Sequence, residues 1–192
     1  MPNRRKLADP KSIVITIGGL HGTGKTTYAR ALAQDLGLRH ISAGQLFRDI
    51  AKEKNLSLEE LNDLACSDPK IDQLIDQRTR EEAEKGGTII DGQLASAIAG
   101  DKADLRILIT APERVRMERI SRRDAIPFEE VVKKTTERER SERERYRRYY
   151  RLDVSDSSIY DIVVDTGMRT IEETMKILKS AIEDYIEKQS QR

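Results

Sequence analysis

A glycine-rich run near the start of the chain constrains the fold more than any other segment. Residues 19–26 read Gly-Leu-His-Gly-Thr-Gly-Lys-Thr, which matches the pattern G-x-x-x-x-G-K-[ST] in full. The run follows the β-rich segment 13–17 and precedes a helical segment that starts at Thr27. Glycines at these positions let the backbone turn its N–H groups around phosphate oxygens, and the dipole of the following helix favours the same anions. The sequence therefore predicts a strand, a phosphate-binding loop and a helix, in that order.

Within this loop, two side chains are predicted to act on a bound nucleoside triphosphate. Lys25 would reach the β- and γ-phosphates, and the hydroxyl of Thr26 would bind Mg²⁺. The residues predicted to contact ATP are Gly19, Leu20, His21, Gly22, Thr23, Gly24, Lys25, Thr26 and Thr27. The alternative is a chance glycine-rich turn, which the complete pattern and its flanking segments disfavour. The loop predicts triphosphate binding but does not identify the phosphate acceptor.

Five short β-rich runs, separated by helical patterns, predict the fold class. They are the segments 13–17, 38–42, 88–91, 105–110 and 160–165. Nearly continuous apolar strands that alternate with helices indicate a parallel sheet covered on both faces. We therefore expect an α/β fold, a three-layer sandwich of the P-loop NTPase type with a five-stranded parallel sheet.

Local signals predict where several helices begin. The spacing of a capping box, Ser or Thr followed three residues later by Glu, occurs at Ser57, Thr110 and Thr170. Asp68, which precedes a proline, fits another helix start. Pro127 is expected to open a long, highly charged helix that ends near residue 151.

Two helical inserts interrupt the alternation of strands and helices. One covers about 45–86, between the second and third strands, and the other covers about 119–151, after the fourth strand. We expect residues 11–192 to form a single domain that includes both inserts. The start of the chain, Met1 to Lys11, is basic, and residues 1–10 are expected to form a flexible arm.

The composition is that of a highly charged globular chain. Of the 192 residues 36% are charged, but the formal net charge is only +1, so overall charge does not indicate a nucleic-acid partner. The single cysteine, Cys66, cannot form an internal disulfide, which fits a reducing compartment. The apolar runs are shorter than the roughly 18 residues of a membrane span. We expect a cytoplasmic monomer with neither membrane nor nucleic-acid partners.

Polar residues after the second and third predicted strands are candidates for the acceptor and metal sites. Ser42 and Gly44 open a helix directly after the second strand, where small residues let a ligand approach the backbone, and Arg48 follows one turn later. The alternative makes Ser42 an N-cap and Arg48 a surface residue. Asp91, at the end of the third strand, is placed to hold Mg²⁺, although Asp-Gly also forms ordinary turns.

Arginines after the fourth strand form a third group of candidates. Arg119 and Arg123 lie on the first part of the second insert, and Arg138 and Arg145 are seven residues apart on the long helix, hence on one face. They are predicted to close over ATP and the acceptor phosphate and to neutralise charge during transfer. The alternative is a solvated helix, because residues 137–145 alternate in sign. We expect most of this helix to be a charged surface on which two or three arginines act.

Several further segments carry a resemblance to a known family when they are taken together with the loop. They are residues 36–48, Asp72 within 70–76, and the segments 102–105, 138–146 and 158–166. With these segments the chain resembles the nucleoside-monophosphate kinases, and is most similar to the archaeal type of cytidylate kinase. The resemblance covers nearly the whole chain from Ile13 onward. It implies transfer of phosphate from ATP to CMP or dCMP, with a monophosphate-binding insert and a lid.

The resemblance also implies roles for single residues. Those matching Arg48, Arg138 and Arg145 hold the acceptor phosphate. Those matching Arg119 and Arg123 meet the adenine and phosphates of ATP, and the loop at Thr166 borders the adenine.

One residue departs from the family pattern. Where the family commonly has an arginine at the acceptor phosphate, this chain has Gln93. Glutamine donates a hydrogen bond but brings no charge, so acceptor affinity is expected to be lower unless other arginines compensate.

Two rival functions stay open at the level of sequence. In the first, the protein is a kinase whose acceptor is a different monophosphate, such as AMP or UMP, or another small phosphate acceptor. In the second, it is an adenylate-kinase-like ATPase that acts in ribosome or RNA maturation. The glutamates interleaved in residues 137–145 disfavour that reading, because a surface that follows nucleic-acid phosphates needs unopposed cations.

Overall fold

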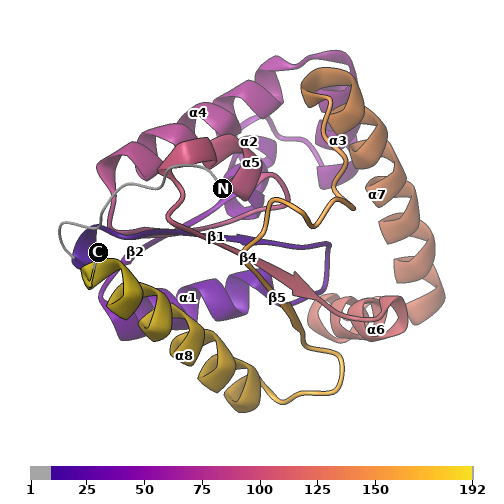
Figure 1. The fold of residues 1–192 in the computed structure, drawn as a ribbon. Helices are drawn as coiled ribbons and strands as arrows, with labels where there is room; N and C mark the ends of the chain where they lie inside the picture. The colour runs from indigo at the N-terminus through magenta and orange to yellow at the C-terminus, as the bar shows by residue number, and fades with distance from the viewer. Residues whose placement is uncertain (1–9, 192) are drawn as a thin grey trace.

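The computed structural model describes residues 10–191, and these contain a five-stranded parallel sheet (Figure 1). Its strands are β1 (Val14–Gly18), β2 (Arg39–Ser42), β3 (Thr88–Asp91), β4 (Leu105–Thr110) and β5 (Ile162–Asp165). Their spatial order is β2-β3-β1-β4-β5, and each neighbouring pair is parallel. The predicted α/β fold is therefore confirmed. The predicted arm lies outside the described residues, except that Pro10 begins the short 3₁₀ helix η1 (Pro10–Ser12).

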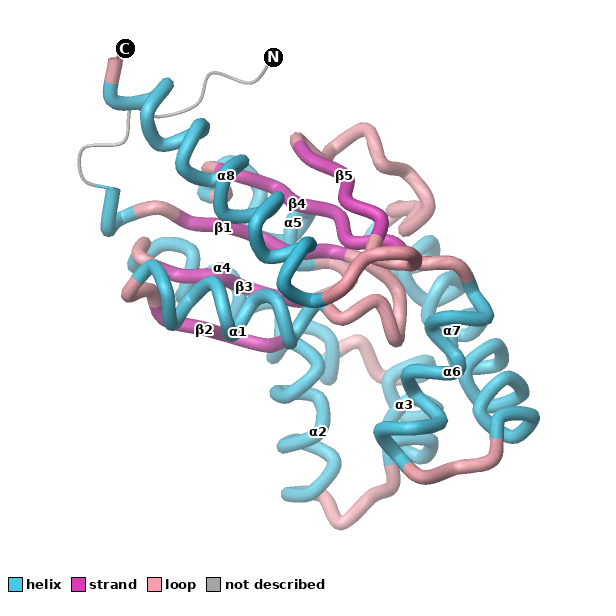
Figure 2. The backbone as a smooth tube through the Cα atoms, turned by 90° about the horizontal axis from the view of Figure 1, so that it is seen from below, coloured by secondary structure: helices cyan, strands magenta, loops and turns pink. Residues whose placement is uncertain are grey.

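Helices cover both faces of the sheet, as the buried strands require. Figure 2 shows α1 (Lys25–Leu36) and α8 (Ile171–Ser190) across one face, while α4 (Lys70–Lys85) and α5 (Ala95–Ala99) cover the other. Successive side chains of a strand point to opposite faces. In β1, Ile15 and its alternate neighbours accordingly pack against α1 and α8, whereas Val14 packs against α4 and α5.

Two further groups of helices lie beyond the ends of the strands. The first contains α2 (Ala43–Glu53) and α3 (Leu58–Ser67) together with α4, and has its own core around Phe47 and Leu61. The second contains α6 (Glu113–Asp124) and α7 (Phe128–Tyr150). In Figure 1, α7 runs beside α3 and joins the two groups. The segments 45–86 and 119–151, which were expected as helical inserts, overlap these two groups, although the second group already begins at Glu113.

Most of the predicted helix starts are present. The capping boxes at Ser57 and Thr170 form with both reciprocal hydrogen bonds. Asp68 accepts a hydrogen bond from the backbone N–H of Lys70 (3.0 Å). The helix α4 begins at Lys70, one residue later than expected, because Pro69 and not Asp68 is its cap residue. The box predicted at Thr110 is wrong, because β4 continues through Thr110 and Pro112 occupies the cap position of α6. The long helix begins after Pro127 as predicted.

The parallel arrangement gathers the carboxyl ends of the strands at one edge, which is where ligands bind in such sheets. At this edge β1 leads into the glycine-rich loop, β3 ends at Asp91 and β4 leads into α6.

The remaining short element is the 3₁₀ helix η2 (Gly100–Lys102). Within residues 10–191, no helix combines the length and apolar character needed to cross a membrane.

Candidate active site

The loop after β1 has the backbone that its glycines predict. Gly22 and Gly24 have φ angles of 77° and 95°, in the left-handed region that favours glycine. A Cβ atom on Gly22 would also lie 2.5 Å from the carbonyl oxygen of Arg116, so the loop packs directly against α6. Gly24 is followed at once by α1, whose free N–H groups face the loop. The predicted strand, loop and helix are therefore present.

Lys25 is held at the inner side of this loop. Its ammonium donates a hydrogen bond to the carbonyl oxygen of Leu20 (2.8 Å). Burial lowers the pKa of Lys25 to about 8, and the nearby carboxylates Asp91 and Glu142 only partly oppose this shift. A polyphosphate bound at the loop would supply the negative charge that stabilises the ammonium form.

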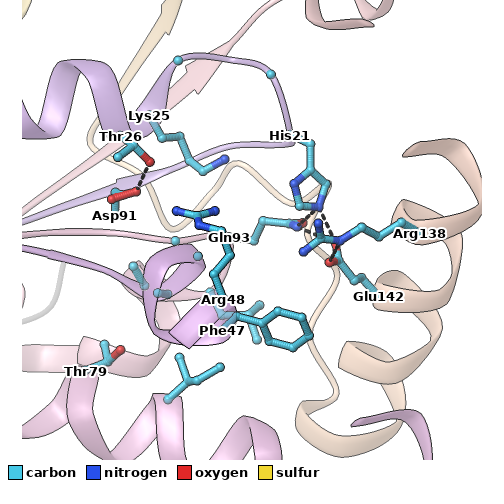
Figure 3. A pocket seen from close by; sticks show the side chains of 18 of the residues that line it. His21, Lys25, Thr26, Phe47, Arg48, Thr79, Asp91, Gln93, Arg138 and Glu142 are labelled. Carbon is cyan, nitrogen blue, oxygen red and sulfur yellow. Dashed lines mark hydrogen bonds and ion pairs between the residues drawn. The ribbon is translucent and has the colours of Figure 1, made fainter. Parts of the chain in front are cut away.

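Thr26 and Asp91, the two residues expected to hold Mg²⁺, lie in direct contact. The Thr26 hydroxyl donates to Asp91 Oδ2 (2.7 Å), as Figure 3 shows. From β2, Ser42 donates to the same oxygen (3.1 Å), and His40 Nε2 lies 3.1 Å from Asp91 Oδ1. Two oxygen ligands suit Mg²⁺, which takes its remaining ligands from water and phosphate. The described part of the chain contains no group of three or more His, Cys, Asp or Glu side chains that could hold a metal ion.

A cavity of about 500 Å³ opens in front of the loop and extends between the two helical groups (Figure 3). It is lined by many of the residues predicted to bind ligands, which are His21, Gly22, Gly24, Lys25, Thr26, Thr27, Gly44, Arg48, Asp91, Gln93, Arg119, Arg123, Arg138 and Arg145. A smaller cavity of about 170 Å³ lies on the other side of the loop and is lined by Gly19, Leu20 and Thr23. Ser42 and Thr166 are buried behind the main cavity, where they contact Asp91 and Arg119 respectively.

Cations gather on one side of the main cavity. The Arg48 guanidinium donates to the neutral amide of Gln45 (3.0 Å). Burial and then the nearby cation of Arg123 lower the pKa of Arg48, and Arg138 adds to this effect. A group of like charges around a cavity favours the binding of an anion.

The two arginines of α6 that were predicted to act in the site, Arg119 and Arg123, differ in their contacts. Arg119 donates both to the hydroxyl of Thr166 (2.9 Å) and to its carbonyl oxygen (2.7 Å), so it is fixed to the end of β5. Arg123 pairs with the adjacent Asp124 (2.7 Å) and stays more exposed. Arg119 is therefore placed firmly at the cavity, whereas Arg123 lies at its rim.

A buried carboxylate that the sequence analysis did not identify organises the middle of the site. Glu142 is 3% exposed, and its Oε2 lies 2.7 Å from His21 Nε2 and 2.6 Å from Gln93 Nε2. Its Oε1 accepts from Arg138 Nε at 2.8 Å. Burial opposes ionisation, but the contacts of His21, Arg138 and Gln93 outweigh it and hold the pKa of Glu142 well below its usual range. Figure 3 shows these side chains converging from the loop, the end of β3 and α7.

A second missed pair lies one turn earlier on α7. Arg116 of α6 is 4% exposed and donates both to the carbonyl oxygen of His21 (2.8 Å) and to Glu139 of α7 (2.6 Å). The phosphate-binding loop is thus attached to both helices of the second group. The alternation of charges in residues 137–145 concealed this pair, because it resembles an exposed helix.

Arg145 occupies a different environment from Arg138. It is 3% exposed, its Nε lies 3.0 Å from Asp72 Oδ2, and its Nη1 donates to the side chain of Asn62 (3.0 Å). Because seven helical residues rise by roughly 10 Å, Arg145 lies two turns along α7 from Arg138. Both line the main cavity, at different depths along the helix.

Solved structures share this fold at low sequence identity. The shikimate kinase of Bacteroides thetaiotaomicron superposes with a TM-score of 0.59 at 16% identity, covering 89% of this chain and 98% of the other. A gluconokinase from Sinorhizobium meliloti gives a TM-score of 0.60 at 13% identity, covering 93% of this chain and 95% of the other. Identities this low are informative about the fold alone.

Sequence relatives are much closer. The cytidylate kinase of Aeropyrum pernix is 48% identical over 162 residues, which is 84% of this chain and 94% of the relative. That of Methanopyrus kandleri is 44% identical over 187 residues, or 93% of this chain and 97% of the relative. The model of the cytidylate kinase-like family matches residues 14–168, which include the loop, Asp91 and both helical groups. By the extent of these matches, the chain belongs to the cytidylate kinase-like family.

Proposed function

We propose that this protein transfers the γ-phosphate of ATP to CMP or dCMP, giving ADP and CDP or dCDP. The observation that carries the proposal is that one cavity joins a complete phosphate-binding loop to a separate group of arginines. The loop suits the triphosphate, and Arg48 with its neighbouring cations suits the phosphate of an acceptor. Family membership favours CMP as that acceptor.

In this proposal the side chains act by position and charge. The attacking oxygen of a nucleoside monophosphate is already anionic, so the step needs no general base. Lys25 and the arginines would stabilise the charge that spreads over the transferred group. Thr26 and Asp91 would hold Mg²⁺, which supplies charge neutralisation at the β- and γ-phosphate oxygens when it is bound.

The two helical groups are proposed to close over the substrates. The group α2–α4 would hold the acceptor and the group α6–α7 would act as the lid, because both line the cavity between them. Closure excludes water, which would otherwise compete for the γ-phosphate.

An acceptor panel tests the proposal. ADP release is measured with Mg·ATP and CMP, dCMP, UMP, AMP, GMP or no acceptor. We expect rapid turnover with CMP and dCMP and slow turnover with the others. Equal, slow release with every nucleotide would contradict the proposal and would indicate a different acceptor.

Replacing Arg48 by alanine is expected to raise the KM for CMP by about tenfold or more, because a charged hydrogen bond to phosphate is lost. The KM for ATP is expected to change less than threefold. Initial rates with each substrate varied in turn measure both constants. The matched control is Arg122→Ala on the exposed face of α6. Equal effects of Arg48→Ala on both constants would place the acceptor phosphate elsewhere.

A further inference from the structure

A histidine beside the residues expected to hold Mg²⁺ has no role in the transfer step described above. The side chain of His40 in β2 is 18% exposed, and its Nε2 lies 3.1 Å from Oδ1 of Asp91, whose side chain is 2% exposed. An ionised carboxylate only accepts hydrogen bonds, so the ring nitrogen is the donor in this contact. His40 thus places an N–H group against a buried carboxylate of the site.

The pairing of β2 with β3 explains why these two side chains meet. His40 lies opposite Ile89, and Ser42 lies opposite Asp91, in the parallel register. Side chains two residues apart on a strand share a face, so His40 and Ser42 point to the same side of the sheet as Asp91. This is the side that α1 covers, because Ile89 packs in the same cluster as Leu32 of α1. The strand register therefore fixes where His40 points.

The two oxygens of Asp91 have different partners. Oδ2 accepts hydrogen bonds from Thr26 (2.7 Å) and from Ser42 (3.1 Å). Oδ1 is contacted by His40, the only residue within 10–191 that has a hydrogen bond to it. The terminal torsion of an aspartate side chain is broad and roughly twofold, so contacts to one oxygen leave the plane of the carboxylate poorly defined. The His40 contact to the second oxygen defines that plane.

A defined carboxylate plane matters for the small cation expected here. Mg²⁺ requires nearly ideal octahedral geometry and uses one or two protein carboxylates besides water and substrate phosphates. Thr26 and Asp91 are the residues expected to hold it, so rotation of the Asp91 carboxylate would weaken the site. Hydrogen-bond partners that orient a ligating side chain typically contribute about 10–100-fold to metal affinity or activity.

We propose that His40 is a positioning residue that orients the Asp91 carboxylate for the divalent cation. The imidazole ring is rigid and belongs to a strand, so it donates its hydrogen bond from a fixed point. Only the N–H at Nε2 is needed, and an amide N–H at the same place would serve as well. This inference rests on the proposed function, because the cation concerned is the one expected to accompany ATP.

The test compares His40→Ala, which removes the donor, with His40→Gln, whose side-chain amide can donate to the same oxygen. The matched control is Ile41→Ala, because Ile41 belongs to the same strand but packs on the opposite face of the sheet, in the cluster that contains Ile90. Calorimetry measures the Kd of the β,γ-imido analogue of ATP in Mg²⁺ and again in EDTA. The ratio of Kd in EDTA to Kd in Mg²⁺ isolates the contribution of the cation.

We expect this ratio to be well above one in wild type and to fall by about tenfold in His40→Ala. It is expected to stay within about threefold of wild type in His40→Gln and in Ile41→Ala, which keep a donor at Oδ1. The Kd in EDTA is expected to change little in any variant. An unchanged ratio in His40→Ala, an equal fall in His40→Gln, or a wild-type ratio near one would overturn the inference. A purely structural role would raise both Kd values together and leave the ratio unchanged.

A double-mutant cycle tests whether His40 acts through Asp91. In the Asp91→Asn background, His40→Ala is expected to leave the ratio unchanged, because the carboxylate that it orients is already lost. An equal fall in both backgrounds would contradict the inference.

A measurement on wild-type protein covers the case in which His40→Ala does not fold. The chain contains two histidines, so NMR spectra of protein labelled with ¹⁵N-histidine show two rings, which His40→Gln or His21→Gln assigns. We expect Nε2 of His40 to carry a proton, and an unprotonated Nε2 would overturn the inference.

None of these measurements includes an acceptor, so the outcomes can be told apart. If wild-type protein does not phosphorylate CMP, the proposed function fails, and the Kd ratio still decides the role of His40. If CMP is phosphorylated but the ratio is unchanged in His40→Ala, only the assignment of His40 fails.

Discussion

Replacing Lys25 by alanine is expected to lower kcat by about 10²–10³-fold while leaving the protein folded. The ammonium lies at the inner side of the phosphate-binding loop, and in the proposed reaction it stabilises charge on the transferred group. Burial lowers the pKa of this ammonium to about 8, which means that the folded protein disfavours its charged form. Removing the charge is therefore expected to cost little free energy of unfolding. ADP release with Mg·ATP and CMP measures kcat, and thermal unfolding is expected to shift by less than about 4 °C.

The matched control is Lys52→Ala, which removes an exposed lysine from α2. It is expected to have wild-type kcat. Turnover by Lys25→Ala within a few-fold of wild type would exclude the role assigned to the loop lysine. Loss of turnover together with loss of the cooperative unfolding transition would point to a folding defect instead.

Replacing Glu142 by alanine is expected to cost about 1–3 kcal/mol of unfolding free energy at pH 7. The change removes hydrogen bonds to three segments of the chain, at His21, Gln93 and Arg138. The side chains of His21 and Arg138 are 22% and 32% exposed, so water can replace part of the hydrogen bonding that they lose. The loss of stability is therefore smaller than for a fully buried charge left without its partner. Urea denaturation measures the difference, and Glu144→Ala, an exposed glutamate of the same helix, is the control.

The pH dependence of this difference follows from the pKa of Glu142, which in the folded protein lies below its ordinary value of 4.5. A lowered carboxyl pKa means that the native state favours the ionised form. The stability that Glu142 contributes is therefore present above about pH 4.5 and is lost as the pH falls toward the folded pKa. We expect wild type and Glu142→Ala to converge in acid, and a constant difference down to pH 3 would contradict this account.

The strands and the phosphate-binding loop could be predicted from the sequence because their signals are local. The tight loop needs left-handed backbone at two positions, and the sequence places Gly22 and Gly24 there, where that backbone costs least. The Ser57 box connects groups only three residues apart. The box at Thr110 failed because a long-range contact prevailed. Strand pairing with β5 brings Asp165 beside Thr110, whose hydroxyl donates to that carboxylate (3.2 Å) instead of capping α6.

The centre of the site was less predictable, because its partners are far apart in the chain. Glu142 lies 121 residues from His21 and 49 from Gln93, and no local pattern connects them. Alternating charges suggested a solvated α7, yet the 3.6-residue period turns Glu139, Glu142 and Arg145 toward the protein. A test of helical periodicity within the charged run would have identified this buried face. The roles of the predicted site residues stay predictions until the variants are measured.

The convergence of His21 and Gln93 on one oxygen of Glu142 limits how position 93 can change. An arginine there would bring a second guanidinium to a carboxylate that already accepts from Arg138 and contacts His21, so its charge would be neutralised by Glu142 rather than by a substrate. Substitutions at 21, 93 and 142 are thus expected to be non-additive. Over evolutionary time, these three positions should vary as a set, and a redesign of the acceptor site should treat them as one unit.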